Sequence, residues 1–239
     1  MARFSYKQVT AATVPLTNWS KFAVHPIADR LLWVLVNFTR IHPNVLTGLS
    51  FVLGIGTCLA FARGDRVGFV TGAILFYSSF GIDTIDGAFA RLTSRTSKLG
   101  AFLDILTDYC RSALASVGLV IGICSTTSDV RILALACSFI AVTLAYYQLG
   151  EISTRLAGER AGRLLERSPG RLASHIATIR RLGFIPTPFG IADYEAVAFV
   201  LGPLLGYPVE GMLFALVIGA ATRLVALAFV MRRFLNAGT

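Results

Sequence analysis

Residues 44–62 read NVLTGLSFVLGIGTCLAFA, an apolar run that contains no charged side chain. A helix needs about 20 predominantly apolar residues to cross the hydrocarbon core of a bilayer, so this run predicts a membrane-spanning helix. A His-Pro pair at 42–43 comes before the run and a Gly-Asp-Arg turn at 64–66 follows it. These turn-forming and charged residues set the limits of the predicted span.

Comparable apolar runs recur along the chain. We predict six spans, at about 44–62, 67–90, 99–124, 131–150, 189–206 and 209–231. Residues before them mix Trp19 and Phe22 with Lys21 and Arg30, a composition typical of a helix in the headgroup layer. The predicted fold is an all-α integral membrane bundle of six transmembrane helices with an N-terminal amphipathic juxtamembrane helix. Its parts are a juxtamembrane region at 1–43 and a six-span domain at 44–239, with a polar loop at 151–188.

The overall composition agrees with a membrane protein. Among 239 residues, 55% are hydrophobic and 15% are charged, whereas soluble domains carry about 25% charged residues. A soluble monomer, a disordered chain and a disulfide-framed secreted module are therefore excluded. The net charge of +9 is explained by basic loops that face anionic headgroups, so the expected partner is the bilayer and not a nucleic acid.

The distribution of basic residues predicts the orientation in the membrane. Only Arg63, Arg66 and Arg131 fall near one set of loops, whereas most other Lys and Arg residues fall near the termini, the loop at 93–98 and the loop at 151–188. Because basic loops stay on the cytoplasmic side, both termini and these two loops are expected to face the cytoplasm.

Four aspartates lie inside the second and third predicted spans, where a charge costs about 2.5–3.5 kcal/mol at mid-bilayer. Asp83 and Asp86 are three residues apart on one helix, so they share a face. Asp104 and Asp108 are four apart on the next helix and share a face as well. The short loop predicts that the two helices are antiparallel neighbours and that these faces meet.

Carboxylates that share a small site need cations to neutralise them. Oxygen ligands select Mg²⁺, Mn²⁺ or Ca²⁺, and four carboxylates could hold two such ions. Two divalent ions suit group transfer at phosphorus. Gly87, Ala90 and Gly100 would let a ligand or a neighbouring helix approach closely, and the planar guanidinium of Arg91 suits a diphosphate.

The complete pattern resembles the signature of the CDP-alcohol phosphotransferase family, also called the class-I CDP-alcohol phosphatidyltransferases. All fixed positions and spacers match, in the order Asp83-x2-Asp86-Gly87-x2-Ala90-Arg91-x8-Gly100-x3-Asp104-x3-Asp108. The resemblance implies an enzyme that cleaves a CDP-linked alcohol, usually CDP-diacylglycerol. It would transfer the phosphate-bearing moiety to an acceptor hydroxyl and release CMP, with two divalent ions, Mg²⁺ or Mn²⁺, as cofactors.

The resemblance also implies a role for each matching residue. Metal ligation falls to Asp83, Asp86, Asp104 and Asp108, and Asp108 is in addition the general base on the acceptor. Contact with the CDP moiety falls to Asp83, Gly87, Ala90, Arg91 and Gly100, with Asn44 and Thr47 lining the nucleotide pocket. Family members are often homodimers, and Gly118 and Gly122 could pack either a helix of the same chain or a second copy.

The acceptor is the least determined part of the prediction. Basic residues near the expected cavity favour a phosphorylated polyol such as inositol phosphate or glycerol phosphate, and the candidates are Arg111, Arg155 and Arg223. Each has an alternative: Arg111 could only neutralise Asp108, Arg155 could lie on a solvated helix, and Arg223 could extend to the interface. Asp193 and Glu195 could stabilise a helix N-terminus or orient acceptor hydroxyls.

Three other functions fit parts of the pattern. A divalent-cation transporter could use the same aspartates, although a transporter places such acids near the midplane rather than toward a cytoplasmic loop. A non-catalytic lipid-binding scaffold would bind the CDP-alcohol without turnover. The same transferase chemistry could also use a soluble CDP-polyol donor.

Overall fold

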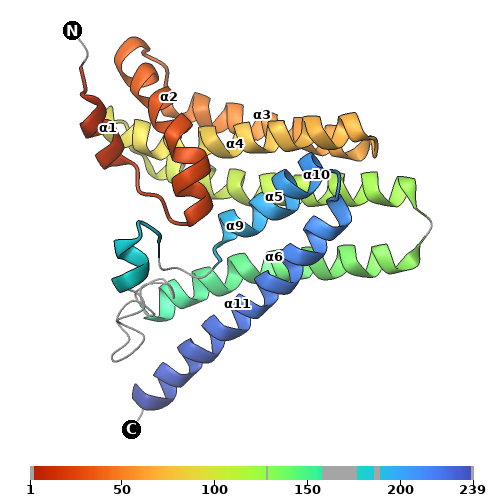
Figure 1. Cartoon of the computed structure of the whole chain (residues 1–239). Helices are drawn as coiled ribbons and strands as arrows, with labels where there is room; N and C mark the ends of the chain where they lie inside the picture. The colour runs from red at the N-terminus through yellow and green to blue at the C-terminus, as the bar shows by residue number, and fades with distance from the viewer. Residues whose placement is uncertain (1–2, 128, 158–176, 186–188, 238–239) are drawn as a thin grey trace.

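A computed structural model describes residues 3–127, 129–157, 177–185 and 189–237. The regular structure of these residues is helical, as expected (Figure 1). The elements follow one another as α1 (Tyr6–Ala12), a π-helical segment (Ser20–Val24), α2 (His25–Phe38), α3 (Pro43–Ala62), α4 (Arg66–Leu92), α5 (Lys98–Thr126), α6 (Val130–Ala157), α9 (Ile191–Glu195), a second π-helical segment (Ala196–Leu201), α10 (Gly202–Leu205) and α11 (Pro208–Ala237).

The polar turns of the sequence cap the helices that carry the aspartates. Asp65 precedes α4, and its carboxylate accepts a hydrogen bond from the backbone N–H of Gly68 at 2.7 Å. Ser97 precedes α5, and its hydroxyl accepts one from the N–H of Gly100 at 2.9 Å. Each contact satisfies a backbone donor that the first helical turn leaves unpaired. The turns therefore fix where each acidic helix begins.

Helix α3 holds the two acidic helices together. It packs extensively against both α4 and α5, whereas α4 and α5 contact each other only sparsely. The short loop between α4 and α5 is present as predicted, but direct packing of these neighbours is not what brings their faces together. Between α3 and α4, Ser50 and Ser79 form a buried pair with their hydroxyl oxygens 3.1 Å apart.

Two glycines let α5 approach α3 closely. A Cβ atom on Gly118 would lie 2.4 Å from the carbonyl oxygen of Cys58, and one on Gly122 would lie 2.0 Å from that of Phe61. Both distances are far below van der Waals contact, so only glycine fits there. Of the two alternatives for these glycines, the structure shows packing within the chain, and the homodimer stays a prediction.

The interior contains two apolar clusters. The larger one joins α3, α4, α5, α6 and α11 to the segment at 191–205, with the rings of Phe76 and Phe199 4.8 Å apart. The smaller one packs α1 and α2 against the part of α4 that carries the aspartates, through Val9, Leu32 and Ile85. The N-terminal helices are therefore part of the core and support the acidic end of α4.

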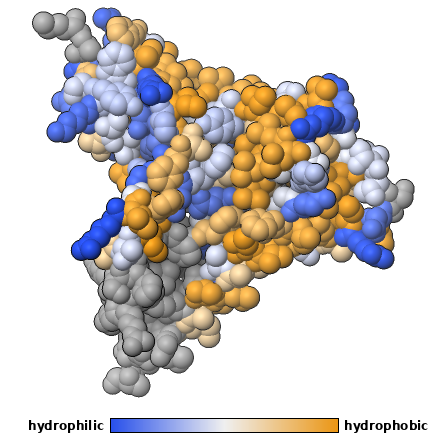
Figure 2. All heavy atoms as spheres, in the orientation of Figure 1, coloured by the Kyte–Doolittle hydropathy of each residue, from blue (hydrophilic) through white to orange (hydrophobic). Residues whose placement is uncertain are grey.

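Within the part of the chain that the structure describes, four helices are long and apolar enough to cross a membrane: α3, α4, α5 and Pro208–Val225 of α11. In Figure 2 apolar residues cover the middle of the visible face, and hydrophilic residues gather toward its ends. These observations agree with an integral membrane protein. Of the remaining predicted spans, α6 has a shorter apolar stretch at Val130–Ala145, and 189–206 is occupied by α9, the second π-helical segment and α10. The count of six spans stays a prediction.

The N-terminal region is helical, and its predicted amphipathic character stays a prediction. On α2, Leu32 and Val36 are buried against α4, whereas Ile27, Val34 and Phe38 are exposed. Apolar residues therefore lie on both faces of α2, and its position at the membrane surface stays a prediction. Most of the predicted polar loop at 151–188 lies outside the described residues, although α6 continues to Ala157.

We expect Gly122→Ala to destabilise the protein. The added methyl group must separate α5 from α3, and overpacking of this kind costs about 1–3 kcal/mol. Gly48→Ala is the matched control, because within the described residues a Cβ there would meet open space and alanine favours the helix by about 1 kcal/mol. Thermal unfolding in detergent should show a lower midpoint for Gly122→Ala and an unchanged or higher one for Gly48→Ala. Equal midpoints would contradict the close-packing argument.

Candidate metal centre

Three carboxylates from two helices form a compact group. Asp83 and Asp86 on α4 and Asp104 on α5 each offer an oxygen, and these oxygens all lie within 4.8 Å of one another. The structure thus brings together the two acidic faces, as the spacing predicts. Asp86 is buried, and Asp83 and Asp104 are partly buried. Because water reaches this group poorly, the mutual repulsion of the carboxylates is weakly screened.

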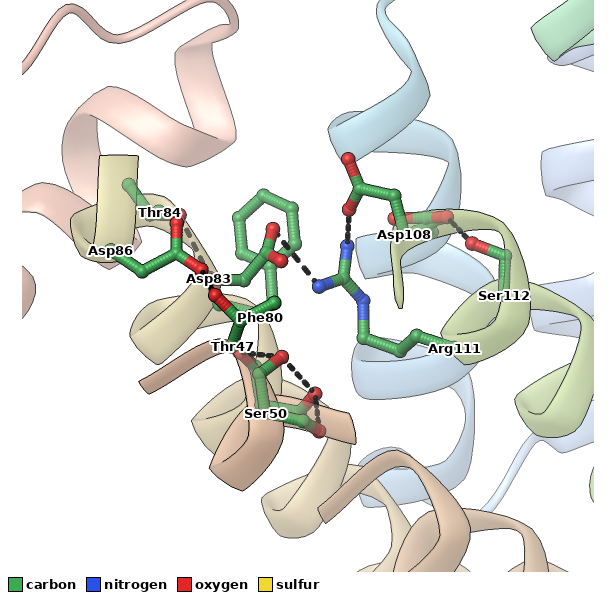
Figure 3. A network of polar contacts seen from close by, with 11 residues as sticks. Thr47, Ser50, Phe80, Asp83, Thr84, Asp86, Asp108, Arg111 and Ser112 are labelled. Carbon is green, nitrogen blue, oxygen red and sulfur yellow. Dashed lines mark hydrogen bonds and ion pairs between the residues drawn. The ribbon is translucent and has the colours of Figure 1, made fainter. Parts of the chain in front are cut away.

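Helix α3 adds a hydroxyl to this group. The Thr47 hydroxyl donates a hydrogen bond to Oδ2 of Asp86 at 2.5 Å, and both side chains are buried. This bond fixes the orientation of the Asp86 carboxylate (Figure 3). Asn44, one turn earlier on α3, lies near the start of α5, since a Cβ on Gly100 would be 3.5 Å from Oδ1 of Asn44.

Asp108 lies one turn beyond Asp104 and is bound to Arg111. Nη2 of Arg111 donates to Oδ1 of Asp108 at 2.5 Å, while Nη1 lies 3.0 Å from Oδ2 of Asp83. Figure 3 shows the guanidinium between the two carboxylates. The side chain of Arg111 is 1% exposed and that of Asp108 is 38% exposed. Of the two roles that the sequence left open for Arg111, the contacts match neutralisation of Asp108.

The donor set fits a hard divalent cation. Oδ1 of Asp83 is buried and has no hydrogen-bond partner among the described residues. A buried carboxylate oxygen without a partner is costly, and a cation would satisfy it. Carboxylate oxygens are the ligands that Mg²⁺ and Mn²⁺ prefer. Asp83, Asp86 and Asp104 could therefore hold such an ion.

The other residues of the motif lie at the end of α4. Arg91 is exposed, and its Nη2 donates to the carbonyl oxygen of Ala12, the last residue of α1, at 3.0 Å. A Cβ on Gly87 would lie 3.3 Å from Nη1 of Arg91, so the missing side chain leaves room for the guanidinium along α4. Ala90 is partly buried on the same turn. The exposed Arg91 is thus about two helical turns from Asp83 along α4.

The candidate acceptor residues are placed unequally. Arg223 is partly buried on α11, whereas the side chain of Arg155, in the last turn of α6, lies outside the described residues. Asp193 accepts hydrogen bonds from the backbone N–H groups of Gly190 at 2.8 Å and Trp19 at 3.0 Å. It therefore caps α9 and ties it to the N-terminal region.

Two side-chain contacts at this site were not predicted from the sequence. The ion pair between Arg111 and Asp83 joins residues from different helices, and the hydroxyl of Ser112 donates to buried Glu195. Ser112 is four residues after Asp108, so the spacing predicts that both lie on the same face of the helix. Its partner on α9 was not, because spacing defines a face but does not say what lies opposite.

A comparison with known proteins identifies the class of the protein. The family model of the CDP-alcohol phosphatidyltransferases matches residues 40–168, a region that contains every position of the motif. The chain therefore belongs to the CDP-alcohol phosphatidyltransferase family, whose members are phosphotransferase enzymes of membranes.

Archaeal proteins are among the similar relatives. The chain is 34% identical over 82 residues to the archaetidylinositol phosphate synthase of Pyrococcus horikoshii, covering 34% of this chain and 42% of that protein. It is 29% identical over 99 residues to the archaetidylinositol phosphate synthase of Methanothermobacter thermautotrophicus, covering 41% of this chain and 45% of that protein. It is 37% identical over 82 residues to a bifunctional IPC transferase and DIPP synthase of Thermococcus kodakarensis, covering 34% of this chain and 18% of that protein. The chain spans less than half the length of these relatives.

We expect Thr47→Val to weaken Mn²⁺ binding by about 10- to 100-fold, the usual effect of losing a group that orients a metal ligand. Valine keeps the shape of threonine but cannot donate to Asp86. Thr47→Ser keeps the hydroxyl and should bind Mn²⁺ nearly as the unchanged protein does. Isothermal titration in detergent measures both. Equal affinities for the valine and serine variants would show that Asp86 does not depend on this hydrogen bond.

Proposed function

We propose that the protein transfers a phosphatidyl or related phospho-alcohol group from a CDP-alcohol, in the first place CDP-diacylglycerol, to an acceptor hydroxyl, with release of CMP. This proposal depends on the group formed by Asp83, Asp86 and Asp104, in which the buried Oδ1 of Asp83 has no hydrogen-bond partner among the described residues. Its place inside the family motif supports phosphoryl transfer over cation transport.

Each residue of the motif has a role in this reaction. Asp83, Asp86, Asp104 and Asp108 would hold two divalent ions, Mg²⁺ or Mn²⁺, which when bound offset the charge on the phosphates and on the leaving CMP. Arg91 would contact the diphosphate with its planar guanidinium. Gly87, Ala90 and Gly100 leave room for the nucleotide, and Asn44 and Thr47 line its pocket.

Asp108 is the proposed general base. Its side chain is 38% exposed, against 10% for Asp83, so an acceptor hydroxyl can reach it. Asp108 takes the proton of this hydroxyl, and the oxygen attacks the phosphorus that bears the donor alcohol. The bond from that phosphorus to the oxygen of CMP breaks, and CMP leaves with the bonding electrons. The ion pair with Arg111 holds the carboxylate of Asp108 beside the group formed by Asp83, Asp86 and Asp104. Asp108 lies one turn beyond Asp104 on α5.

A phosphorylated polyol is the proposed acceptor, with inositol phosphate first. Two relatives are named archaetidylinositol phosphate synthases, and a product of that name contains inositol phosphate. The arginines at 155 and 223 would bind the acceptor phosphate. The basic loops support a cytoplasmic location for both termini and the site, and a homodimer is the proposed assembly.

We expect purified protein to release CMP from CDP-diacylglycerol only when Mg²⁺ or Mn²⁺ and the correct acceptor are both present. The panel would contain inositol phosphate, glycerol phosphate, inositol and serine, and inositol phosphate should be the most active. Asp104→Ala should abolish release because it removes a metal ligand, and Asp108→Asn should abolish it because it removes the base.

Two results would contradict the proposed transferase. One is CMP release that does not respond to metal or to either variant. The other is Mn²⁺ flux into proteoliposomes without any CDP-alcohol, which would identify a transporter.

We expect Arg223→Gln to raise the KM for inositol phosphate by about tenfold or more, because a charged hydrogen bond to phosphate is worth about 1.5–3 kcal/mol. The KM for CDP-diacylglycerol should stay unchanged. Arg131→Gln, which alters an arginine whose side chain is 91% exposed, is the control and should change neither constant. A KM for the acceptor that is unchanged in Arg223→Gln would remove Arg223 from the acceptor site.

A further inference from the structure

Arg111 is a fixed cation inside the candidate metal centre. Its guanidinium forms ion pairs with one oxygen of Asp83 and one oxygen of Asp108, on two different helices. The ring centres of Phe80 and Phe76 lie 5.3 Å and 5.9 Å from the guanidinium carbon. Two carboxylates and two aromatic rings thus lie around this charge, which stays protonated because arginine does not titrate in proteins.

The backbone around Arg111 leaves it little freedom. A Cβ on Gly54 of α3 would lie 3.6 Å from both Cα and Cγ of Arg111, so α3 packs directly against this turn of α5. The side chain is 1% exposed. The Cα and Cγ atoms of Arg111 therefore pack against α3, and the buried guanidinium lies between the two carboxylates.

Arg111 pairs with one oxygen of Asp83 and with one oxygen of Asp108. Asp83 presents Oδ2 to Arg111 and keeps Oδ1 without a hydrogen-bond partner among the described residues. Oδ1 of Asp108 is likewise taken by Arg111. A divalent ion that bridged Asp83 and Asp108 would stand beside the positive charge of Arg111, in surroundings that screen repulsion weakly. Of the three residues Asp83, Asp86 and Asp104, it is Asp83 that these ion pairs involve.

We propose that Arg111 acts as the resident cation of the Asp83–Asp108 half of the centre and limits the protein without donor to one divalent ion. That ion is held by Asp83, Asp86 and Asp104. A second ion joins only with the CDP-alcohol, whose diphosphate supplies the negative charge and oxygen ligands that offset Arg111. Arg111 is then a positioning residue for Asp108, and donor and second ion favour each other's binding reciprocally. The inference rests on the proposed function for the identity of the donor.

Counting bound ions tests this inference without turnover. In detergent and without donor, titration with Mn²⁺ followed by electron paramagnetic resonance should give one tightly bound ion per chain, and CDP-diacylglycerol should raise the number to two. Arg111→Gln should bind two ions without donor, because Asp108 and Oδ2 of Asp83 become available. Two ions in the unchanged protein without donor, or one ion in a folded Arg111→Gln variant, would overturn the proposal.

A second pair of variants serves if Arg111→Gln does not fold. Asp108→Asn keeps Arg111 and the shape of the side chain, so the affinity for the first Mn²⁺ should stay within about twofold. Asp104→Asn should weaken it by about tenfold or more, the usual loss for a disturbed metal site. Equal weakening in both variants would overturn the inference. Absent CMP release with the expected ion counts would instead contradict the proposed function alone.

Discussion

Like charges repel, and this repulsion is the constraint on which the centre of the molecule depends. Asp83, Asp86 and Asp104 present oxygens within 4.8 Å of one another inside an apolar helix bundle, where each charge costs free energy. The arrangement is tolerable only with positive charge or hydrogen-bond donors nearby. Arg111 supplies the first and Thr47 supplies the second, and the oxygen of Asp83 that remains calls for a metal ion.

Helix α3 makes this arrangement rigid. It carries Thr47, which orients Asp86, and Ser50, which is paired with Ser79 of α4. Toward its C-terminal end it packs against Gly118 and Gly122 of α5 at distances that exclude any side chain. The acidic helices are thus positioned by a third helix that contributes no carboxylate to the centre. Substitutions on α3 far from the acids should therefore affect the reaction by changing the relative positions of α4 and α5.

Local pattern was enough to predict much of this structure. The apolar runs at 44–62, 67–90 and 99–124 became α3, α4 and α5 with ends that shift by a few residues, because charged and polar caps stop a helix locally. The i,i+3 and i,i+4 spacings placed the aspartates on facing surfaces. The motif that gave the family was confirmed by the matching family model.

Contacts between distant segments could not be predicted in this way. Spacing shows that Arg111 shares a face with Asp108, but its pairing with Asp83 depends on how α3 sets the distance between α4 and α5. The predicted span at 189–206 is helical but divided by a π-helical segment, which apolar composition alone does not reveal. The partner of Ser112, Glu195, likewise comes from a helix more than 80 residues away along the chain.

Asp83, Asp86 and Asp104 form a cation site in the mechanism that we propose. Anomalous scattering from crystals grown with Mn²⁺ locates such an ion directly, without reference to turnover. We expect an anomalous peak bounded by carboxylate oxygens of these three residues, with the Thr47 hydrogen bond to Asp86 preserved. Well-ordered carboxylates with no peak between them at saturating Mn²⁺, or a peak only elsewhere in the protein, would contradict it.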